Sequence, residues 1–367
     1  MSSKLQIAST TTLSLSDQFQ STLASSQTSP QSATSDHGNE LDPLSLLSAS
    51  STALKFHVTK LSLLTINSPF TPSAASATLS TLNESVLPSL TTATLLVTAE
   101  YHTKAFQTEI RVLTATALKE LSLLVKVVQT VAQEKVDQKG LEQSEKDTVT
   151  VAAGRVWDAC DVLIDVAARG VIGFVVRRAE QYRDLVRDAV EEIEAWDPDE
   201  DGDAIFYDLL SDDENKAGAD VEEDGDEDDQ SGSAALHTWK KDTLRILKPI
   251  AQIYPAIISN RIKKGPPTPL AQGNIKILES LLKDLQQIPD HVDEVAGALY
   301  EADLNKYTRQ LGKTKSCAVN VLGLVVLPWG NGQPSTGDKF TTWSKTWIKV
   351  MEEVSKSIDE PLIPRSS

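Results

Sequence analysis

Apolar residues recur at steps of three and four along most of the chain, a pattern that predicts helices and no sheet. The segment from Lys104 to Gln133 shows it most clearly, with one continuous stripe of Phe106, Ile110, Leu113, Ala117, Leu121, Leu124, Val128 and Val131. A second stripe, which includes Val112 and Leu118, widens the apolar face beyond that of a surface helix. We therefore expect this segment to be a central helix of a bundle.

Start and stop signals predict the other helices. Asp42 followed by Pro43 is a helix start and predicts a helix over 43–65. Near the N-terminus, a looser helical spacing joins Leu5, Leu15, Phe19 and Leu23. Glycines and prolines divide the rest into expected helices over 72–101 with a bend at Pro88, 144–169 closed by Gly170, 173–196, 233–264 kinked at Pro249 and Pro255, 274–288, 290–311 after a break at Pro289, and 337–359. On the last helix, the expected buried face is Phe340, Trp343, Trp347, Val350, Val354 and Ile358.

The 367-residue length favours two domains, because it exceeds what one hydrophobic core usually serves. We predict an all-α fold of two packed bundles of four to five helices, vinculin-like in type, joined by an acidic disordered segment. The expected parts are a Ser/Thr-rich N-terminal helix and flexible link over 1–40, an N-terminal bundle over 41–196, an acidic linker over 197–231 and a C-terminal bundle over 232–367.

Negative charge is concentrated in the segment from Asp197 to Asp229, which holds 17 Asp and Glu residues against one basic residue, Lys216. The formal net charge of the chain is −17, so the remainder is close to neutral. A protein that binds nucleic acid directly needs a basic face, which this composition does not supply. No apolar run approaches the length of a membrane-spanning helix. Protein partners, basic ones in particular, are therefore expected, with no direct nucleic-acid binding and no membrane.

The acidic segment begins with a string that resembles a calcium loop. Asp197, Asp199 and Asp201 take the first, third and fifth positions, Gly202 the sixth, and Asp208 stands at the twelfth, where a bidentate Glu is usual. Composition alone can produce this spacing in a run so rich in Asp, so a metal site and a solvated acidic loop are both open interpretations.

Two short strings predict regulation rather than catalysis. Ser211 precedes Asp212, Asp213 and Glu214, a pattern that acidophilic kinases favour, and Ser29 precedes Pro30 as in a proline-directed site. Unmodified loops are the alternative. No catalytic triad, nucleophile elbow or cofactor fingerprint is present, which favours a protein that is not an enzyme and needs no cofactor.

The run Val156, Trp157, Asp158, Ala159, Cys160 and Asp161, followed by an Arg-rich amphipathic helix and by Phe206-Tyr207-Asp208-Leu209-Leu210, resembles the cyclin-D-binding protein family, also called GCIP. The resemblance covers roughly residues 54–214. It implies an all-helical protein of cytoplasm and nucleus that binds D-type cyclins or helix-loop-helix transcription factors. By resemblance, the protein is a non-enzymatic negative regulator of cell-cycle progression that sequesters these partners.

Two other interpretations stay open. A structural helical-bundle scaffold of vinculin-like type would bind cytoskeletal or trafficking proteins and use the same fold. An acidic histone-chaperone-like protein would use the charge of the segment from Asp197 to Asp229.

Overall fold

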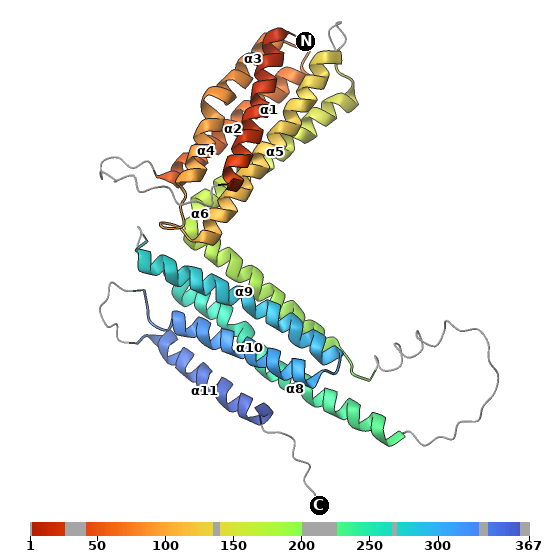
Figure 1. Ribbon diagram of the computed structural model, residues 1–367, viewed down its shortest axis with the longest axis vertical. Helices are drawn as coiled ribbons and strands as arrows, with labels where there is room; N and C mark the ends of the chain where they lie inside the picture. The colour runs from red at the N-terminus through yellow and green to blue at the C-terminus, as the bar shows by residue number, and fades with distance from the viewer. Residues whose placement is uncertain are drawn as a thin grey trace, which may run out of the picture. The chain divides into compact units, whose positions relative to one another are not determined.

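The computed structural model describes residues 2–25, 42–134, 140–199, 226–265, 270–329 and 337–359, and within these ranges it contains helices and no strand (Figure 1). The predicted all-α class is thereby confirmed. The chain divides into two compact units, unit 1 over Met1–Phe174 and unit 2 over Val175–Ser367. This division falls inside a helix that the sequence assigns to the first domain, so the boundary at residue 196 stays a prediction.

Unit 1 is a bundle in which α1 packs on α5 and α3, and α2 packs on α4. The first part of α6 completes it. Its elements are α1 (Ser3–Ser25), α2 (Pro43–Ile66), α3 (Pro72–Thr81), the π-helical turn η1 (Leu82–Val86), α4 (Leu87–Leu96), α5 (Lys104–Glu134) and α6 (Gln143–Ala195). Pro88 stands at the start of α4, directly after η1, so the predicted irregularity coincides with a π-turn.

The N-terminal helix α1 confirms the predicted helix but differs in its buried face. Leu5 and Leu23 are buried, whereas Leu15 and Phe19 are half-buried. The remaining core positions are taken by small residues, namely Ala8, Ser9, Thr12 and Ser16. Thr12 Oγ1 donates to the carbonyl of Ala8 at 2.9 Å, so this hydroxyl is satisfied by the helix that carries it. A pattern based on apolar residues alone misses such positions.

Helix α6 is interrupted at Gly170, which has a φ of 62° and a ψ of −166°. Glycine populates this region without the steric cost that a Cβ brings. The predicted end of a helix at Gly170 and the start of another shortly after it are therefore correct. Residues from Val175 onward in α6 belong to unit 2.

Unit 2 contains the last part of α6 together with α8, α9, α10 and α11. The bounds are α8 (Asp226–Ile257), the π-helical turn η2 (Ile258–Ile262), α9 (Gln272–Tyr300), α10 (Leu304–Leu324) and α11 (Lys339–Asp359). Helices α9 and α10 pair along their lengths, and α8 contacts α9, α10 and α11. Pro249 and Pro255 both lie inside α8, and η2 follows the second of them.

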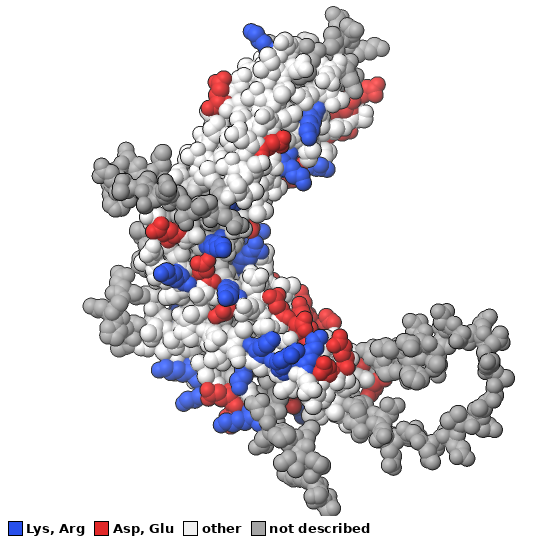
Figure 2. Space-filling model, viewed as in Figure 1, with Lys and Arg blue, Asp and Glu red and all other residues white. Residues whose placement is uncertain are grey.

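The surface charge of the two units differs. On the face drawn in Figure 2, uncharged residues cover most of the region formed by α1 to α5, whereas charged residues of both signs crowd the region formed by α8 to α11. The sequence carries the same difference, with 28 charged residues in 1–174 and 59 in 175–367.

The predicted break at Pro289 is wrong, because α9 runs without interruption from Gln272 to Tyr300 and buries this proline. Proline removes the N–H that would bond the carbonyl four residues earlier, here that of Leu285. The buried hydroxyl of Tyr254 on α8 donates to this carbonyl at 3.0 Å and replaces the missing partner. The chain turns instead at Glu301–Asp303, where Ala302 has a φ of 54° and Asp303 caps α10 through the N–H of Lys306.

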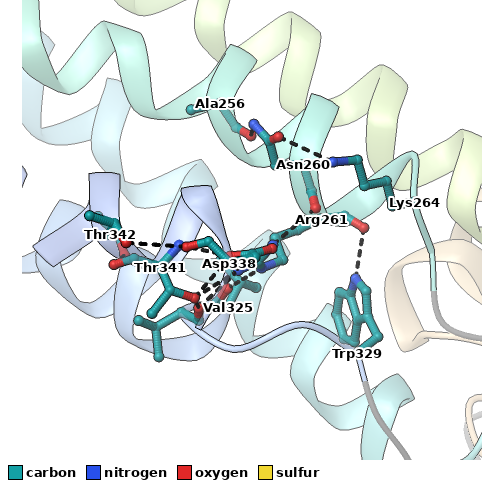
Figure 3. A network of polar contacts seen from close by, with 11 residues as sticks. Ala256, Asn260, Arg261, Lys264, Val325, Trp329, Asp338, Thr341 and Thr342 are labelled. Atoms are coloured by element: carbon teal, nitrogen blue, oxygen red, sulfur yellow. Dashed lines mark hydrogen bonds and ion pairs between the residues drawn. The ribbon is translucent and has the colours of Figure 1, made fainter. Parts of the chain in front are cut away.

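Arg261 in η2 joins three elements of unit 2 (Figure 3). Its side chain is 1% exposed, and its guanidinium donates to the carbonyls of Val325 and Val326, which follow α10. The same group binds both carboxylate oxygens of Asp338 at 2.7 and 2.9 Å. Asp338 in turn caps α11 by accepting from the N–H of Thr341 at 2.9 Å.

We call Arg261 and Asp338, with the two carbonyls that Arg261 binds, the arginine clasp. A cation at the C-terminal end of α10 and an anion at the N-terminal end of α11 both suit the helix dipoles. The centroid of the Phe340 ring lies 4.2 Å from the guanidinium carbon, and the Trp329 indole donates to the carbonyl of Arg261 at 2.7 Å. The clasp thus fixes where α10 ends and where α11 begins.

The buried face of α11 differs in part from the prediction. Phe340 and Trp347 are buried as expected, whereas Val350 is 45% exposed. Met351 lies in the core in its place. The indole of Trp347 donates to the carbonyl of Pro249 on α8 at 3.0 Å, and this contact sets the rotation of α11.

Candidate functional site

The outward face of α2 presents apolar side chains to solvent. Phe56 is 64% exposed and Leu63 is 49% exposed, and the two lie seven residues apart, on one side of the helix. Both are on the side opposite the core residues Leu54, Val58 and Leu61. Helix α2 is fixed at its start by Asp42, whose carboxylate accepts from the N–H groups of Leu44 and Ser45 at 3.2 Å.

A groove of about 460 Å³ opens on this face, and the segment after α2 forms its wall. We call it the α2 groove. It is lined by Phe56, Thr59, Lys60, Leu63, Leu64, Asn67, Pro69 and Thr71. Asn67 is held at the helix end by its N–H, which donates to the carbonyl of Leu63 at 3.1 Å. The lining is thus apolar, with a few polar groups at its edge.

Lys60 is the charged residue of that lining, and within the described residues it forms no ion pair. The neighbouring His57 contacts the Phe56 ring edge-on at 5.2 Å between centroids. Burial, with a smaller contribution from the Lys60 charge, lowers the pKa of His57, so this imidazole is neutral at pH 7. A ligand in the α2 groove therefore meets an apolar wall and one ammonium group.

The residues that carry the family resemblance lie on α6, beside α2. Val156 and Cys160 are buried, Trp157 and Ala159 are half-buried, and Asp158 and Asp161 are exposed. The Trp157 indole nitrogen is buried and makes no hydrogen bond within the described residues. The carboxylate of Asp161 binds the ammonium of Lys55 on α2 at 2.6 Å.

This ion pair joins the exposed side of the family motif to α2 one helical turn before Thr59, which lines the α2 groove. The motif thus contributes core residues with one face and a link to α2 with the other. Cys160 belongs to the core: burial, strengthened by the Asp161 charge, raises the pKa of its thiol to about 12. A thiol in this state is a packing group and a poor nucleophile.

The predicted calcium-loop residues are described in part. Asp197 and Asp199 follow the end of α6, and Asp197 accepts from the N–H of Asp199 at 3.1 Å. Asp201 and Asp208 lie outside the described residues. The structure brings Asp197 and Asp199 close to a histidine of α8, His237. No local sequence pattern points to this histidine, because it lies 38 residues beyond Asp199.

The predicted phosphorylation sites Ser211 and Ser29 both lie outside the described residues and stay predictions. No helix in the described part of the chain combines the length and the apolar character that crossing a membrane requires.

The sequence model described as "Grap2 and cyclin-D-interacting, N-terminal" matches residues 46–199. This match confirms the resemblance seen in the sequence, and it includes most of α2, the α2 groove and the motif on α6. An uncharacterized protein of the fission yeast Schizosaccharomyces pombe (strain 972 / ATCC 24843) is 22% identical over 206 residues, which are 56% of this chain and 55% of that protein. The chain therefore spans about half the length of this relative.

Proposed function

Since residues 46–199 match the N-terminal region of the Grap2 and cyclin-D-interacting family, we propose that this protein is a non-enzymatic regulator that binds a D-type cyclin. By holding the cyclin, it would restrain cell-cycle progression, in cytoplasm and nucleus. Helix-loop-helix transcription factors are the second partner class that the resemblance implies. The observation that carries the proposal is the α2 groove, which lies inside the matched residues.

The chemistry of the α2 groove favours a helix as the bound element. Phe56 and Leu63 offer two apolar contacts two helical turns apart, and an amphipathic helix supplies matching apolar residues at the same spacing. Lys60 between them adds a positive charge that would pair with an acidic residue on the partner. We therefore expect the bound helix to carry an apolar stripe flanked by Asp or Glu.

The test is the affinity of the purified full chain for a D-type cyclin, measured by calorimetry. Leu63→Glu places a carboxylate on the exposed wall of the groove, where it should leave the bundle intact. We expect the dissociation constant to rise at least about tenfold, because exposed apolar anchors dominate such interfaces. Val112→Glu is the matched control, since Val112 on α5 of the same unit is 56% exposed, contrary to its predicted place in the second apolar stripe.

The outcomes of this experiment test the proposed partner and the proposed binding site separately. If the unaltered protein binds no D-type cyclin, the proposed partner is wrong, and the same assay with a helix-loop-helix domain tests the second class. If it binds and Leu63→Glu binds equally well, the partner stands and the α2 groove is not the site. Recovery of cytoskeletal or trafficking proteins from cells, with no binding of either class, would favour the scaffold interpretation.

A further inference from the structure

Two segments far apart in the sequence meet at the C-terminal end of α6. Asp197 and Asp199 follow directly after α6, and His237 lies on α8, beyond the acidic stretch. One ligand atom from each of the three side chains lies within 4.8 Å of the other two. The imidazole Nε2 of His237 is 3.2 Å from Oδ2 of Asp199.

Neighbouring contacts hold these segments in place. The ammonium of Lys240, one turn further along α8, donates to the carbonyl of Trp196. Farther along the same pair of helices, Lys248 binds Glu194 at 2.8 Å. The Trp196 ring also packs on Tyr300 of α9, with 5.0 Å between the centroids. The end of α6 is therefore anchored on both sides, so the carboxylates of Asp197 and Asp199 face His237 in the folded unit.

We propose that Asp197, Asp199 and His237 bind one Zn²⁺ ion. A zinc ion with ligands at about 2.0–2.2 Å holds them roughly 3–3.6 Å apart, so small rotations of these side chains complete the site. The side chains of His237 and Asp199 are 47% and 62% exposed, which gives an ion access and leaves the rotations unhindered. The fourth ligand would be water.

The chemical nature of the three ligands favours zinc over calcium or magnesium. Calcium and magnesium take oxygen ligands, whereas an imidazole nitrogen combined with two carboxylates suits zinc and its first-row neighbours. Two carboxylates and a neutral imidazole also place two negative charges against a divalent cation. The ammonium of Lys240 is directed at the Trp196 carbonyl. Two residues of the predicted calcium loop, Asp197 and Asp199, are thus ligands of this site, but the ion is zinc and the third protein ligand is His237.

The role of the ion would be structural. It would join the end of α6 to α8 across the stretch 200–225, and so tie together the two ends of the most acidic part of the chain. Binding to the folded form alone would stabilise this end of unit 2 by mass action.

The experiment titrates Zn²⁺ into the chelator-treated full chain and follows the imidazole resonances of the five histidines by NMR, with calorimetry for stoichiometry. We expect saturable binding of one ion and a shift of the His237 resonances. His237→Ala and Asp199→Asn should each weaken binding at least about tenfold. His291→Ala, which removes the other histidine of unit 2, should leave affinity unchanged. Circular dichroism checks that each variant keeps its helical content.

Two results would overturn the proposal. One is the absence of saturable binding at micromolar Zn²⁺. The other is binding that leaves the His237 resonances in place and is displaced by excess Ca²⁺, which would assign the ion to carboxylates of the acidic segment. Both are independent of cyclin binding, which the Leu63→Glu experiment addresses separately.

Discussion

Units 1 and 2 are both helical bundles, but they satisfy their buried polar groups in different ways. In unit 1, several buried hydroxyls bond within their own helix, as Ser51 does with the carbonyl of Leu47 and Thr65 with that of Leu61, both at 2.8 Å. The hydroxyls of Thr94 on α4 and Thr114 on α5, 2.9 Å apart, form a pair between two helices. In unit 2, Tyr254 bonds the backbone of α9, and Arg261 bonds the backbone directly after α10. Composition reflects the difference, with 47 Ser and Thr in residues 1–174 against 21 in residues 175–367.

The difference bears on how each unit is held together. A hydroxyl that donates to a carbonyl of its own helix needs no hydrogen-bond partner on another helix. The packing between helices then depends on shape and on apolar contacts. A group that bonds a second helix makes two elements depend on each other, so its loss exposes an unpaired partner. We therefore expect unit 2 to respond strongly to single polar substitutions and unit 1 to respond weakly.

The largest effect is expected from Arg261→Met, which keeps an unbranched side chain and removes the guanidinium. The carbonyls of Val325 and Val326 and the carboxylate of Asp338 would lose the guanidinium together, and Thr341 would be the partner that remains for Val326 and Asp338. We expect the free energy of unfolding of unit 2 to fall by about 3 kcal/mol or more. Urea unfolding measures the loss, and hydrogen exchange should localise it to the end of α10 and the start of α11.

The control is Arg245→Met, on α8, the helix that η2 follows, because Arg245 is 51% exposed and pairs with Asp242 at 3.5 Å. Exposed pairs contribute about 1 kcal/mol or less. Equal losses from the two substitutions would show that the clasp does not hold α11.

The second expected effect is a dependence on acid. Hydrogen bonds from Arg261 and Thr341 hold the pKa of Asp338 well below its ordinary value of 3.8. A carboxylate with a lowered folded-state pKa stabilises the fold above its unfolded-state pKa and loses that contribution as the pH falls. Asp338→Asn should therefore be less stable than the unaltered protein at pH 7, and the difference should narrow below about pH 4. A difference independent of pH would contradict the assigned cause.

The smallest effects compare one buried hydroxyl from each unit. Tyr254→Phe leaves the carbonyl of Leu285 without a partner, because Pro289 has no N–H to offer, and should cost about 1–2 kcal/mol. Thr65→Val is the matched control in unit 1: the carbonyl of Leu61 keeps its backbone bond, so the expected cost is below about 0.5 kcal/mol. Urea unfolding of the two variants measures both losses of stability. Equal losses would show that the two units do not differ in how strongly they depend on buried hydroxyls.

The amino-acid sequence by itself determined the helices and several of their ends. The Asp42–Pro43 start, the stop at Gly170 and the central stripe from Phe106 to Val131 depend on neighbouring residues in the chain. The structure confirms the start, the stop and the stripe except at Leu113, which is half-buried, and it exposes Val112 of the second stripe. The family resemblance was also readable, because it rests on a contiguous run of residues. Such signals act over one or two helical turns and need no knowledge of the fold.

Tertiary structure alone decided the features that depend on distant partners. Pro289 continues a helix because Tyr254, 35 positions earlier in the sequence, supplies the missing hydrogen bond. Arg261 is buried because the ends of two other helices surround it, although its place within the stripe of Tyr254, Ile257, Ile258 and Ile262 was a signal that could have been used. His237 meets Asp197 and Asp199 because α8 returns along α6. In each case a polar group is stabilised by a contact that no local pattern encodes.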